Sequence, residues 1–279
     1  MYIYQSRYLT RAEVWYDDEP GDLGSVDWVF YSLRSRPVPG ARWKYFYNYL
    51  IDLTQTVPQL EARLREETAY KIRRARDRDG IVCECCDPND PAVMDRFEQM
   101  YNRFAATKGL SPLSRARLNS MAAAGVLDLS VARDPGGDAL VCHANHRGPH
   151  RATQLHSPSL YPGLSASATR NRIGRANRYL FWNDILRFKE QGLKWFDFGG
   201  WYPGTTDQTL LRINQFKNGF GGELRREYQC EQIVSLKGWL VLNVAKRLEQ
   251  AKCFRSGSRT PVTQSPPTAM RQPAAAASM

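Results

Sequence analysis

The sequence has no long apolar run and no apolar leader. Its longest apolar stretches, such as Met121 to Val126 and Trp239 to Leu242, fall far short of the roughly 20 residues that a membrane-spanning helix needs. The first residues, Met1 to Tyr8, mix polar and apolar side chains, which excludes the basic-then-apolar pattern of a secretory leader. We therefore expect no transmembrane segment and a cytoplasmic location.

Cysteine and histidine are also sparse. Six cysteines and four histidines occur in 279 residues, and no histidine stands at zinc-finger spacing from the cysteines, which argues against a structural metal. No arrangement of Ser, Cys and His indicates a covalent enzyme intermediate. The sequence thus predicts neither a metal cofactor nor ping-pong chemistry.

Positive charge is in excess. The formal net charge is +11 and the sequence pI is about 9.5, so the surface field attracts polyanions such as tRNA, nucleotide-linked substrates or anionic lipid faces. No acidic residue follows Glu249, and from about Ser256 the composition shifts to Ser, Thr, Pro and Ala. Such a segment buries too little apolar area to offset its ordering entropy, which predicts a disordered tail over residues 253–279.

Three segments before residue 90 show clear periodicity. Trp43 to Asp52 alternates with period two and is rich in aromatic residues, which predicts a strand buried mostly on both faces. Thr56 to Gln59 offers a capping box with a first-turn proline, and the apolar spacing after it, through Ala75, predicts a single helix that Gly80 ends. Ile81 to Cys86 then predicts a second strand.

From Asp90 onward the pattern predicts two helices, a three-strand meander, and then helix, strand, helix and strand. The expected ranges are a helix starting at 90, a helix over 114–124, strands over 127–133, 139–146 and 151–157, a helix over 174–191, a strand over 193–198, a helix over 206–218 and a strand over 222–230. This order describes an α+β fold.

Four segments resemble one family. Trp195 to Gly200 reads WFDFGG and Ile213 to Glu223 reads INQFKNGFGGE, which is similar to the DFGG and FK-x-x-FGG signature of the FemAB-like and BioF2-like branch of the GNAT acyltransferase superfamily. Tyr70 to Ala75 resembles the basic helix end of that branch, and Ala176 to Ile185 resembles one of its later helices. The matches run in the right order over roughly residues 43 to 230.

The resemblance implies a GNAT-type fold, a mixed sheet flanked by helices, and transfer of an acyl group to a primary amine. Fem-type members take aminoacyl-tRNA and extend a cell-wall peptide, often on a nucleotide-linked precursor, whereas other GNAT members take acyl-CoA. Fem-type proteins carry two GNAT-like lobes. On this basis residues 1–89 are predicted to be a truncated first lobe, residues 90–232 the acyltransferase domain and residues 233–252 a C-terminal helix.

Lys217 is the first candidate catalytic residue. It shares the helical stripe of Leu210, Ile213 and Asn214, so it is predicted to point inward. A lysine in the last turn is also favoured by the helix dipole, and a snorkelling lysine is the alternative. The resemblance places the pair Phe216 and Lys217 at the acceptor and donor site, where the ammonium holds an anion and stabilises oxyanion charge.

Asp197 is the second candidate. Strand alternation places it on the face opposite Phe196 and Phe198, where it either acts as general base for the attacking amine or holds the loop after the strand. Gly199 and Gly200 follow, and they permit backbone turns and close approach of a substrate.

A phosphate site is predicted at the start of the helix expected from residue 174. Arg170, Asn171, Arg172, Gly174 and Ala176 stand where a GNAT enzyme has its pyrophosphate loop, although Asn171 replaces the usual Gln or Arg. Asn177 either faces the cleft or bonds backbone. Lys71 and Arg74 share a helical face that is either a solvated surface or a phosphate contact.

We expect an acyl- or aminoacyl-transferase of cell-envelope, peptide or natural-product biosynthesis, with the acyl donor as co-substrate and an amine-bearing acceptor. Aminoacyl-tRNA is the preferred donor, because the surface is basic and the pyrophosphate loop departs from the family pattern. An acyl-CoA-dependent N-acetyltransferase is the alternative within this class. A non-catalytic RNA- or polyanion-binding protein on a GNAT scaffold is the alternative of another class.

Overall fold

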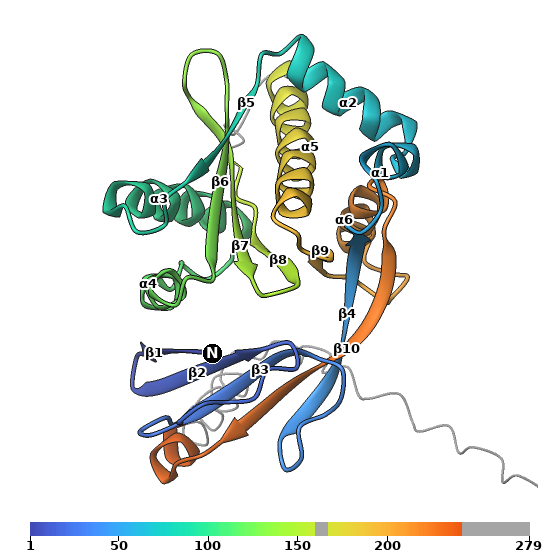
Figure 1. Cartoon of the computed structure of the whole chain (residues 1–279). Helices are drawn as coiled ribbons and strands as arrows, with labels where there is room; N and C mark the ends of the chain where they lie inside the picture. Colours follow the sequence, from blue (N-terminus) through green and yellow to red (C-terminus); the bar gives the residue numbers. More distant parts are fainter. Residues whose placement is uncertain (160–166, 242–279) are drawn as a thin grey trace, which may run out of the picture.

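The computed structural model of the chain describes residues 1–159 and 167–241 (Figure 1). Its strands are β1 (Tyr2–Ser6), β2 (Leu9–Trp15), β3 (Trp28–Arg34), β4 (Arg42–Asp52), β5 (Val82–Cys86), β6 (Leu127–Arg133), β7 (Ala139–Arg147), β8 (Arg151–His156), β9 (Trp195–Gly200) and β10 (Glu223–Ile233). Its helices are α1 (Val57–Arg63), α2 (Glu66–Asp77), α3 (Pro91–Lys108), α4 (Arg115–Ala123), α5 (Ser167–Glu190) and α6 (Gln208–Asn218).

All these strands join one mixed sheet in the order β1-β2-β3-β10-β4-β9-β8-β7-β6-β5. Two neighbouring pairs, β2 with β3 and β8 with β9, are parallel, and the other pairs are antiparallel. The long ribbon of β4 and β10 connects the part that carries the helices to the part formed by β1, β2 and β3 (Figure 1). The predicted α+β fold, a mixed sheet flanked by helices, is confirmed.

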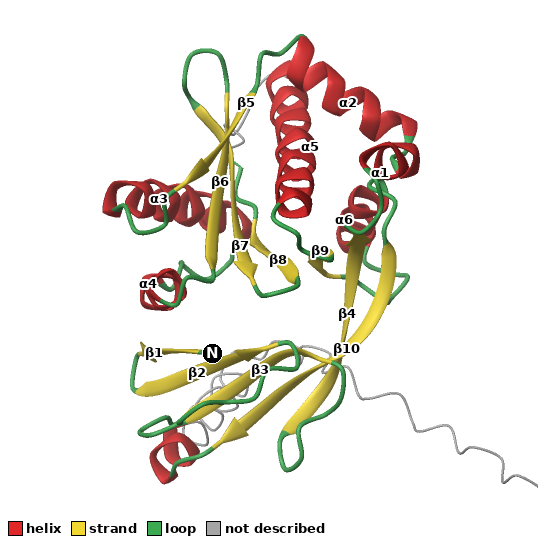
Figure 2. Cartoon of the chain, in the orientation of Figure 1, coloured by secondary structure: helices red, strands yellow, loops and turns green. Residues whose placement is uncertain are grey.

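Helices cover both faces of the sheet (Figure 2). On one face α5 packs Phe181, Ile185 and Phe188 against Phe196 of β9. On the other face α3 and α4 pack on β6, and their apolar side chains also meet Tyr2 and Trp15 of the N-terminal strands. Burial of these two apolar layers stabilises the fold.

Local capping signals are confirmed. Thr56 and Gln59 form the predicted capping box, and Asp90 and Ser114 cap α3 and α4 through their side chains. The three-strand meander is present as β6, β7 and β8, paired antiparallel.

Three expectations about elements are wrong. The single helix expected before Gly80 is two, α1 and α2, because the chain extends at Leu64 and the N–H of Arg65 donates to the carbonyl of Gly219 at 3.0 Å. Strand β4 is not buried on both faces: its first half is exposed, and Trp43 is 50% and Tyr45 41% exposed. Helix α5 is already present at Ser167, seven residues before the predicted start at Gly174.

Strands β1, β2 and β3 were not predicted. They lie at one edge of the sheet, and β3 joins it by pairing with β10. At the other end of the chain, residues 236–241 are helical, while the rest of the predicted C-terminal helix and the predicted tail lie outside the described residues. In the described part of the chain, no helix combines the length and apolarity that crossing a membrane requires.

Candidate active site

The parallel strands β8 and β9 part at their C-terminal ends. They pair from Arg151 opposite Trp195 to Thr153 opposite Asp197, and both strands then continue without pairing to each other. Strand β8 also has a bulge: Asn145 of β7 pairs with Gln154 and its neighbour Ala144 with His156, which makes Leu155 the extra residue. A bulge leaves backbone groups outside the ladder, and here the side-chain amide of Gln154 donates to the carbonyls of Ala144 and His156.

A cavity of about 260 Å³ lies at this opening. It is lined from β8 by Thr153, Gln154 and Leu155, and from β9 by the predicted Gly199 and Gly200. Its other walls are Trp15, Phe30, Ser32, Leu33, Phe46, Arg117 and Gln229. Ligand pockets of proteins measure roughly 300–1,000 Å³, so this cavity has room for a small reacting group.

Gly199 forms a narrow part of this opening. Its φ is +69°, a region that favours glycine, and a Cβ added there would lie 3.0 Å from the carbonyl oxygen of Gln154. The glycine therefore lets β9 turn away while its backbone stays close to β8.

Lys217 lies beside this opening. Its side chain is buried, with the residue 8% exposed, and Nζ donates to the carbonyl of Gly199 at 3.3 Å and to that of Gly200. Burial lowers the pKa of the ammonium to about 8, although the charge of Asp197 acts in the opposite direction. Lys217 points inward as expected, but the stripe from which this was predicted does not: Leu210 is 38% and Ile213 44% exposed, and on α6 only Asn214 and Lys217 are buried. The catalytic role stays a prediction. Phe216 lies in the aromatic core with Phe181.

Asp197 is fully buried and both its oxygens are engaged. Oδ2 accepts from Nη2 of Arg151 at 2.6 Å and from Oγ1 of Thr153 at 3.2 Å, and Oδ1 accepts from the N–H of Gly199 at 2.7 Å. The bond to Gly199 holds the start of the loop. This geometry favours the loop-holding interpretation of Asp197 over the general-base one.

The partners of Asp197 were not found from the sequence. Arg151 also binds Glu227 of β10 at 2.7 and 2.8 Å, and Glu227 accepts from Nδ2 of Asn48 at 2.5 Å. These side chains come from β4, β8, β9 and β10 and share the face opposite the phenylalanines. The only signal in the sequence was charge inside two predicted strands, Arg151 in one and Glu227 among four charged residues in the other, without any indication that these two side chains meet.

The predicted pyrophosphate loop is helical. Because α5 is present from Ser167, the backbone N–H groups of Asn171, Gly174 and Ala176 lie beyond the free first turn and are used within the helix. Arg170 and Asn171 are exposed, and Arg172 pairs with Asp134 at 3.1 Å. The expectation of a helix terminus at these residues is therefore wrong, and a phosphate contact by their side chains stays a prediction.

Among the described residues Asn177 bonds side chains and not backbone, and its place in the cleft stays a prediction. Its Oδ1 accepts from Oγ of Ser157 at 3.1 Å and lies 2.9 Å from Nε2 of His143. The other ring nitrogen of His143 lies 2.8 Å from Oδ2 of Asp184, a fully buried carboxylate of α5. Asn177 thus belongs to a polar network of side chains between α5 and the sheet.

Lys71 and Arg74 have partners on their own helix. Lys71 pairs with Glu67, and Nη1 of Arg74 donates to the hydroxyl of Tyr70 at 3.1 Å. This arrangement is typical of a solvated helix surface. In the described ranges, no group of three or more His, Cys, Asp or Glu residues could hold a metal ion.

Comparison with known proteins shows which fold the chain shares. No protein-family model and no curated protein sequence matches the chain. Among solved structures, FemX matches with a TM-score of 0.55 at 12% identity, over 67% of this chain and 61% of FemX. The chain has the GNAT-type fold of FemX. It spans less than two thirds of the FemX chain.

Two further structures match over most of the chain. The C-terminal domain of a putative lysylphosphatidylglycerol synthetase from Agrobacterium fabrum has a TM-score of 0.49 at 15% identity, over 79% of this chain and 72% of that one. L-PGS from Bacillus licheniformis has a TM-score of 0.49 at 12% identity, over 77% and 71% of the two chains. At sequence identities this low, the roles of residues in those proteins cannot be assigned to residues of this chain.

Proposed function

We propose that the protein transfers an acyl or aminoacyl group to a primary amine at the opening between β8 and β9. The observation that carries this proposal is a buried lysine, Lys217, held against the carbonyls of Gly199 and Gly200 where two parallel strands part. Both glycines line the small cavity at this opening, although Lys217 itself does not. The fold shared with FemX supports a transferase. The acceptor is an amine on a cell-envelope, peptide or nucleotide-linked molecule.

The reaction is direct attack of the acceptor amine on the donor carbonyl. As the C–N bond forms, negative charge develops on the carbonyl oxygen, and an ammonium in a water-poor site stabilises that charge. Lys217 has three N–H groups, two of which bind backbone carbonyls, with no third partner among the described residues. The third N–H is available to the oxyanion. The C–O bond to the donor hydroxyl then breaks, and the amine proton leaves to the departing oxygen or to water.

Asp197 and Arg151 position this site without taking part in proton transfer. Asp197 holds the N–H of Gly199, whose carbonyl accepts from Lys217. The buried ion pair with Arg151 fixes the carboxylate in turn. Such preorganisation lowers the cost of aligning the ammonium with the reacting carbonyl.

An exposed aromatic stripe supports aminoacyl-tRNA as the donor. Trp43, Tyr45 and Tyr228 lie on one face of β4 and β10 with ring centroids 5.2–5.5 Å apart, and the guanidinium of Arg226 lies 4.6 Å from the ring centroid of Tyr45. Base stacking on exposed aromatic residues contributes roughly 1–3 kcal/mol per base, and arginine adds phosphate or base contacts. We call Trp43, Tyr45, Tyr228 and Arg226 the aromatic stripe.

The aromatic stripe leads toward Lys217. Strand alternation puts Tyr47 and Tyr49 on the same face, one after the other toward α6. The hydroxyl of Tyr49 donates to Oδ1 of Asn218, the residue after Lys217, at 2.9 Å. An RNA end stacked on the aromatic stripe would therefore extend along this face toward α6 and Lys217, whereas the cavity, with Phe46 in its wall, lies on the opposite face of β4.

The transfer is tested with charged tRNA and, separately, with a panel of acyl-CoA thioesters, by measuring donor-dependent mass gain on candidate amines. We expect transfer from aminoacyl-tRNA and a loss of about 100-fold or more in Lys217→Ala. Lys189→Ala is the matched control, because Nζ of Lys189 also donates to a backbone carbonyl, that of Leu53, at 2.9 Å. Wild-type rates in Lys217→Ala would refute the site, and transfer from acyl-CoA alone would refute the donor.

The aromatic stripe is tested by tRNA affinity. We expect Trp43→Ala to weaken binding by about tenfold, which corresponds to one lost stacking contact. Tyr8→Ala is the control, because Tyr8 is 72% exposed and lies outside the stripe. Equal effects of the two substitutions, or tRNA binding that is insensitive to salt between about 50 and 200 mM, would contradict an RNA donor on this surface.

A further inference from the structure

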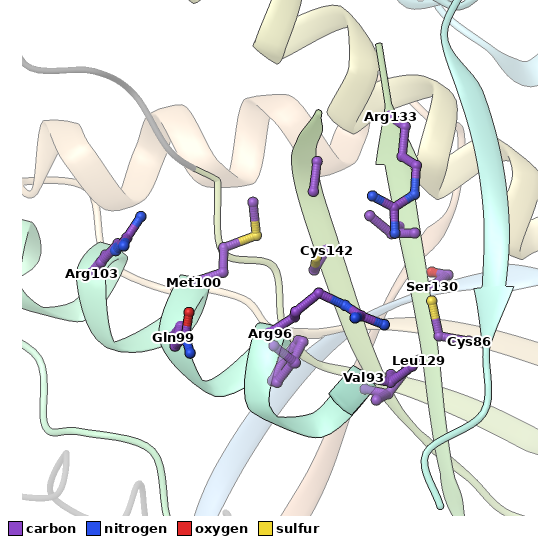
Figure 3. A pocket seen from close by; sticks show the side chains of 13 residues that line it. Cys86, Val93, Arg96, Gln99, Met100, Arg103, Leu129, Ser130, Arg133 and Cys142 are labelled. Atoms are coloured by element: carbon purple, nitrogen blue, oxygen red, sulfur yellow. The ribbon is translucent and has the colours of Figure 1, made fainter. Parts of the chain in front are cut away.

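A second cavity, of about 190 Å³, lies between α3 and the strands β5, β6 and β7 (Figure 3). It contains none of the residues of the candidate active site. Its lining residues are Cys86, Val93, Arg96, Phe97, Gln99, Met100, Arg103, Leu129, Ser130, Val131, Arg133, Ala139 and Cys142.

The floor of this cavity is apolar. Phe97, Met100, Leu129 and Val131 are all at most 6% exposed. Cys142 adds a thiol whose pKa burial raises to about 12, so it stays a neutral, weakly polar group at physiological pH. An apolar protein cavity of about 150 Å³ is large enough to bind benzene. The cavity thus has room for a ring or a short alkyl chain.

The rim is cationic. Arg96, Arg103 and Arg133 line the cavity, and none of the described residues that line it is acidic. Figure 3 shows the side chains of Arg96, from α3, and Arg133, from β6, extending over the same space. Like charges around an apolar space repel one another, and an anion bound between them removes that repulsion.

The guanidinium groups have bonding capacity left. Nε of Arg133 donates to Glu84 at 2.9 Å and its Nη1 to the carbonyl of Gly137 at 3.1 Å, which leaves Nη2 without a hydrogen-bond partner among the described residues. Arg96 and Arg103 form no ion pair with any residue in the described ranges. A guanidinium fork matches the geometry of a carboxylate or phosphate.

We propose that this cavity binds a small amphipathic anion. Its alkyl or aryl group, of about six carbons, fills the apolar floor, and its carboxylate or phosphate contacts Arg96 and Arg133 at the rim. This inference is independent of the proposed transferase activity, because it rests on residues of α3, β5, β6 and β7 that the activity does not use.

The proposal is tested by calorimetric titration of the full chain with hexanoate, hexyl phosphate and the neutral hexanol. We expect saturable, one-to-one binding of at least one of the two anions, and at least tenfold weaker binding of hexanol. The tighter of the two anions identifies the headgroup. Arg96→Ala removes an exposed side chain, and we expect it to weaken anion binding by about tenfold, the effect of one charged hydrogen bond.

Two further variants complete the test. Met100→Trp fills the cavity and is expected to abolish binding, and its circular dichroism spectrum shows whether it folds. Arg73→Ala, on the exposed side of α2, is expected to bind like the wild type. The proposal is overturned if neither anion binds saturably, if hexanol binds as tightly as the anions, or if Arg96→Ala binds like Arg73→Ala.

Discussion

The charge state of Lys217 decides the pH dependence of the reaction. If the ammonium stabilises the oxyanion, the active form is the protonated one, which is lost as pH rises through the pKa of about 8. We therefore expect kcat/KM for transfer to fall above about pH 8. Lys217→Arg, whose guanidinium stays charged throughout, is expected to lack this fall while retaining part of the activity.

The measurement is a profile of kcat/KM between pH 6 and pH 10 with an acceptor whose amine titrates outside this range. A rate that rises through pH 8 in the wild type would show that the neutral amine is the active form. In that case Lys217 would be a base, and the oxyanion role would be wrong.

Arg151 is the positive partner of two buried carboxylates, those of Asp197 and Glu227. It pairs with Asp197 at 2.6 Å and with Glu227 at 2.7 Å, and all three side chains are at most 9% exposed. Removing one partner of a buried ion pair leaves an uncompensated charge and typically costs about 3–5 kcal/mol. We expect Arg151→Met to lower the free energy of unfolding by about this amount in urea denaturation.

Arg225→Met is the control for Arg151→Met. Arg225 pairs with Glu223 at 3.3 Å across partly exposed side chains, 37% and 56%, and exposed pairs contribute roughly 0–1 kcal/mol. Similar losses in the two variants would mean that the buried network does not stabilise the strands around the opening.

The buried network of Arg151, Asp197 and Glu227 also shows which properties of single residues could be predicted from the sequence and which could not. Alternation, a local property, correctly placed Asp197 opposite Phe196 and Phe198. Helical spacing gave the right side for Lys217 but the wrong reason, because Leu210 and Ile213 of the same expected stripe are exposed. Arg151 contacts both Asp197 and Glu227 only because β8 lies beside β9 and β4 alone separates β9 from β10 in the sheet, and strand pairing is not encoded in the period of any one strand.

At the scale of elements, the opening between β8 and β9 depends on the backbone of Gly199. We expect Gly199→Ala to destabilise the protein through two terms. A left-handed backbone costs a non-glycine residue about 1–2 kcal/mol, and the contact of the new Cβ with the carbonyl of Gln154, at 3.0 Å, adds roughly 1–3 kcal/mol. Transfer activity is expected to fall with it, because the carbonyl of Gly199 holds Lys217.

Gly137→Ala separates the cost of the left-handed backbone from the cost of the Cβ contact. Gly137 has a φ of +89°, and an added Cβ there meets nothing within 4 Å, so only the backbone term applies. Urea unfolding of both variants gives the difference. If Gly199→Ala costs no more than Gly137→Ala, the close approach of β9 to β8 is not a constraint.

Elements with local start signals were predicted well, and those without were not. Capping residues located α1, α3 and α4, because a cap acts within one turn. The break between α1 and α2 depends on a hydrogen bond from Arg65 to Gly219, 154 residues away. The exposed half of β4 was also misjudged, since an aromatic strand has the same period whether or not a layer covers it.

At the scale of the whole molecule, the sheet crosses the predicted domain boundary before Asp90. Strand β4 lies between β9 and β10, and β5 pairs with β6, although both β4 and β5 precede the boundary. On the α3 and α4 side, Arg117 of α4 forms an ion pair with the buried Glu13 of β2 at 2.6 Å. The first 89 residues therefore contribute to the same core as the rest.

This continuity predicts that residues 90–241 do not fold alone. Without β3 and β4 the fragment exposes one edge of β9 and both edges of β10, and the apolar residues Tyr49, Ile51 and Leu53 disappear from the core around Phe196 and Phe198. We expect the full chain to unfold in one cooperative urea transition, followed by circular dichroism and by tryptophan fluorescence, and the fragment to show no such transition. A cooperative transition of the fragment at comparable urea concentration would establish residues 90–232 as an independent domain, and the contacts across Asp90 would then be an interface between domains and not part of a shared core.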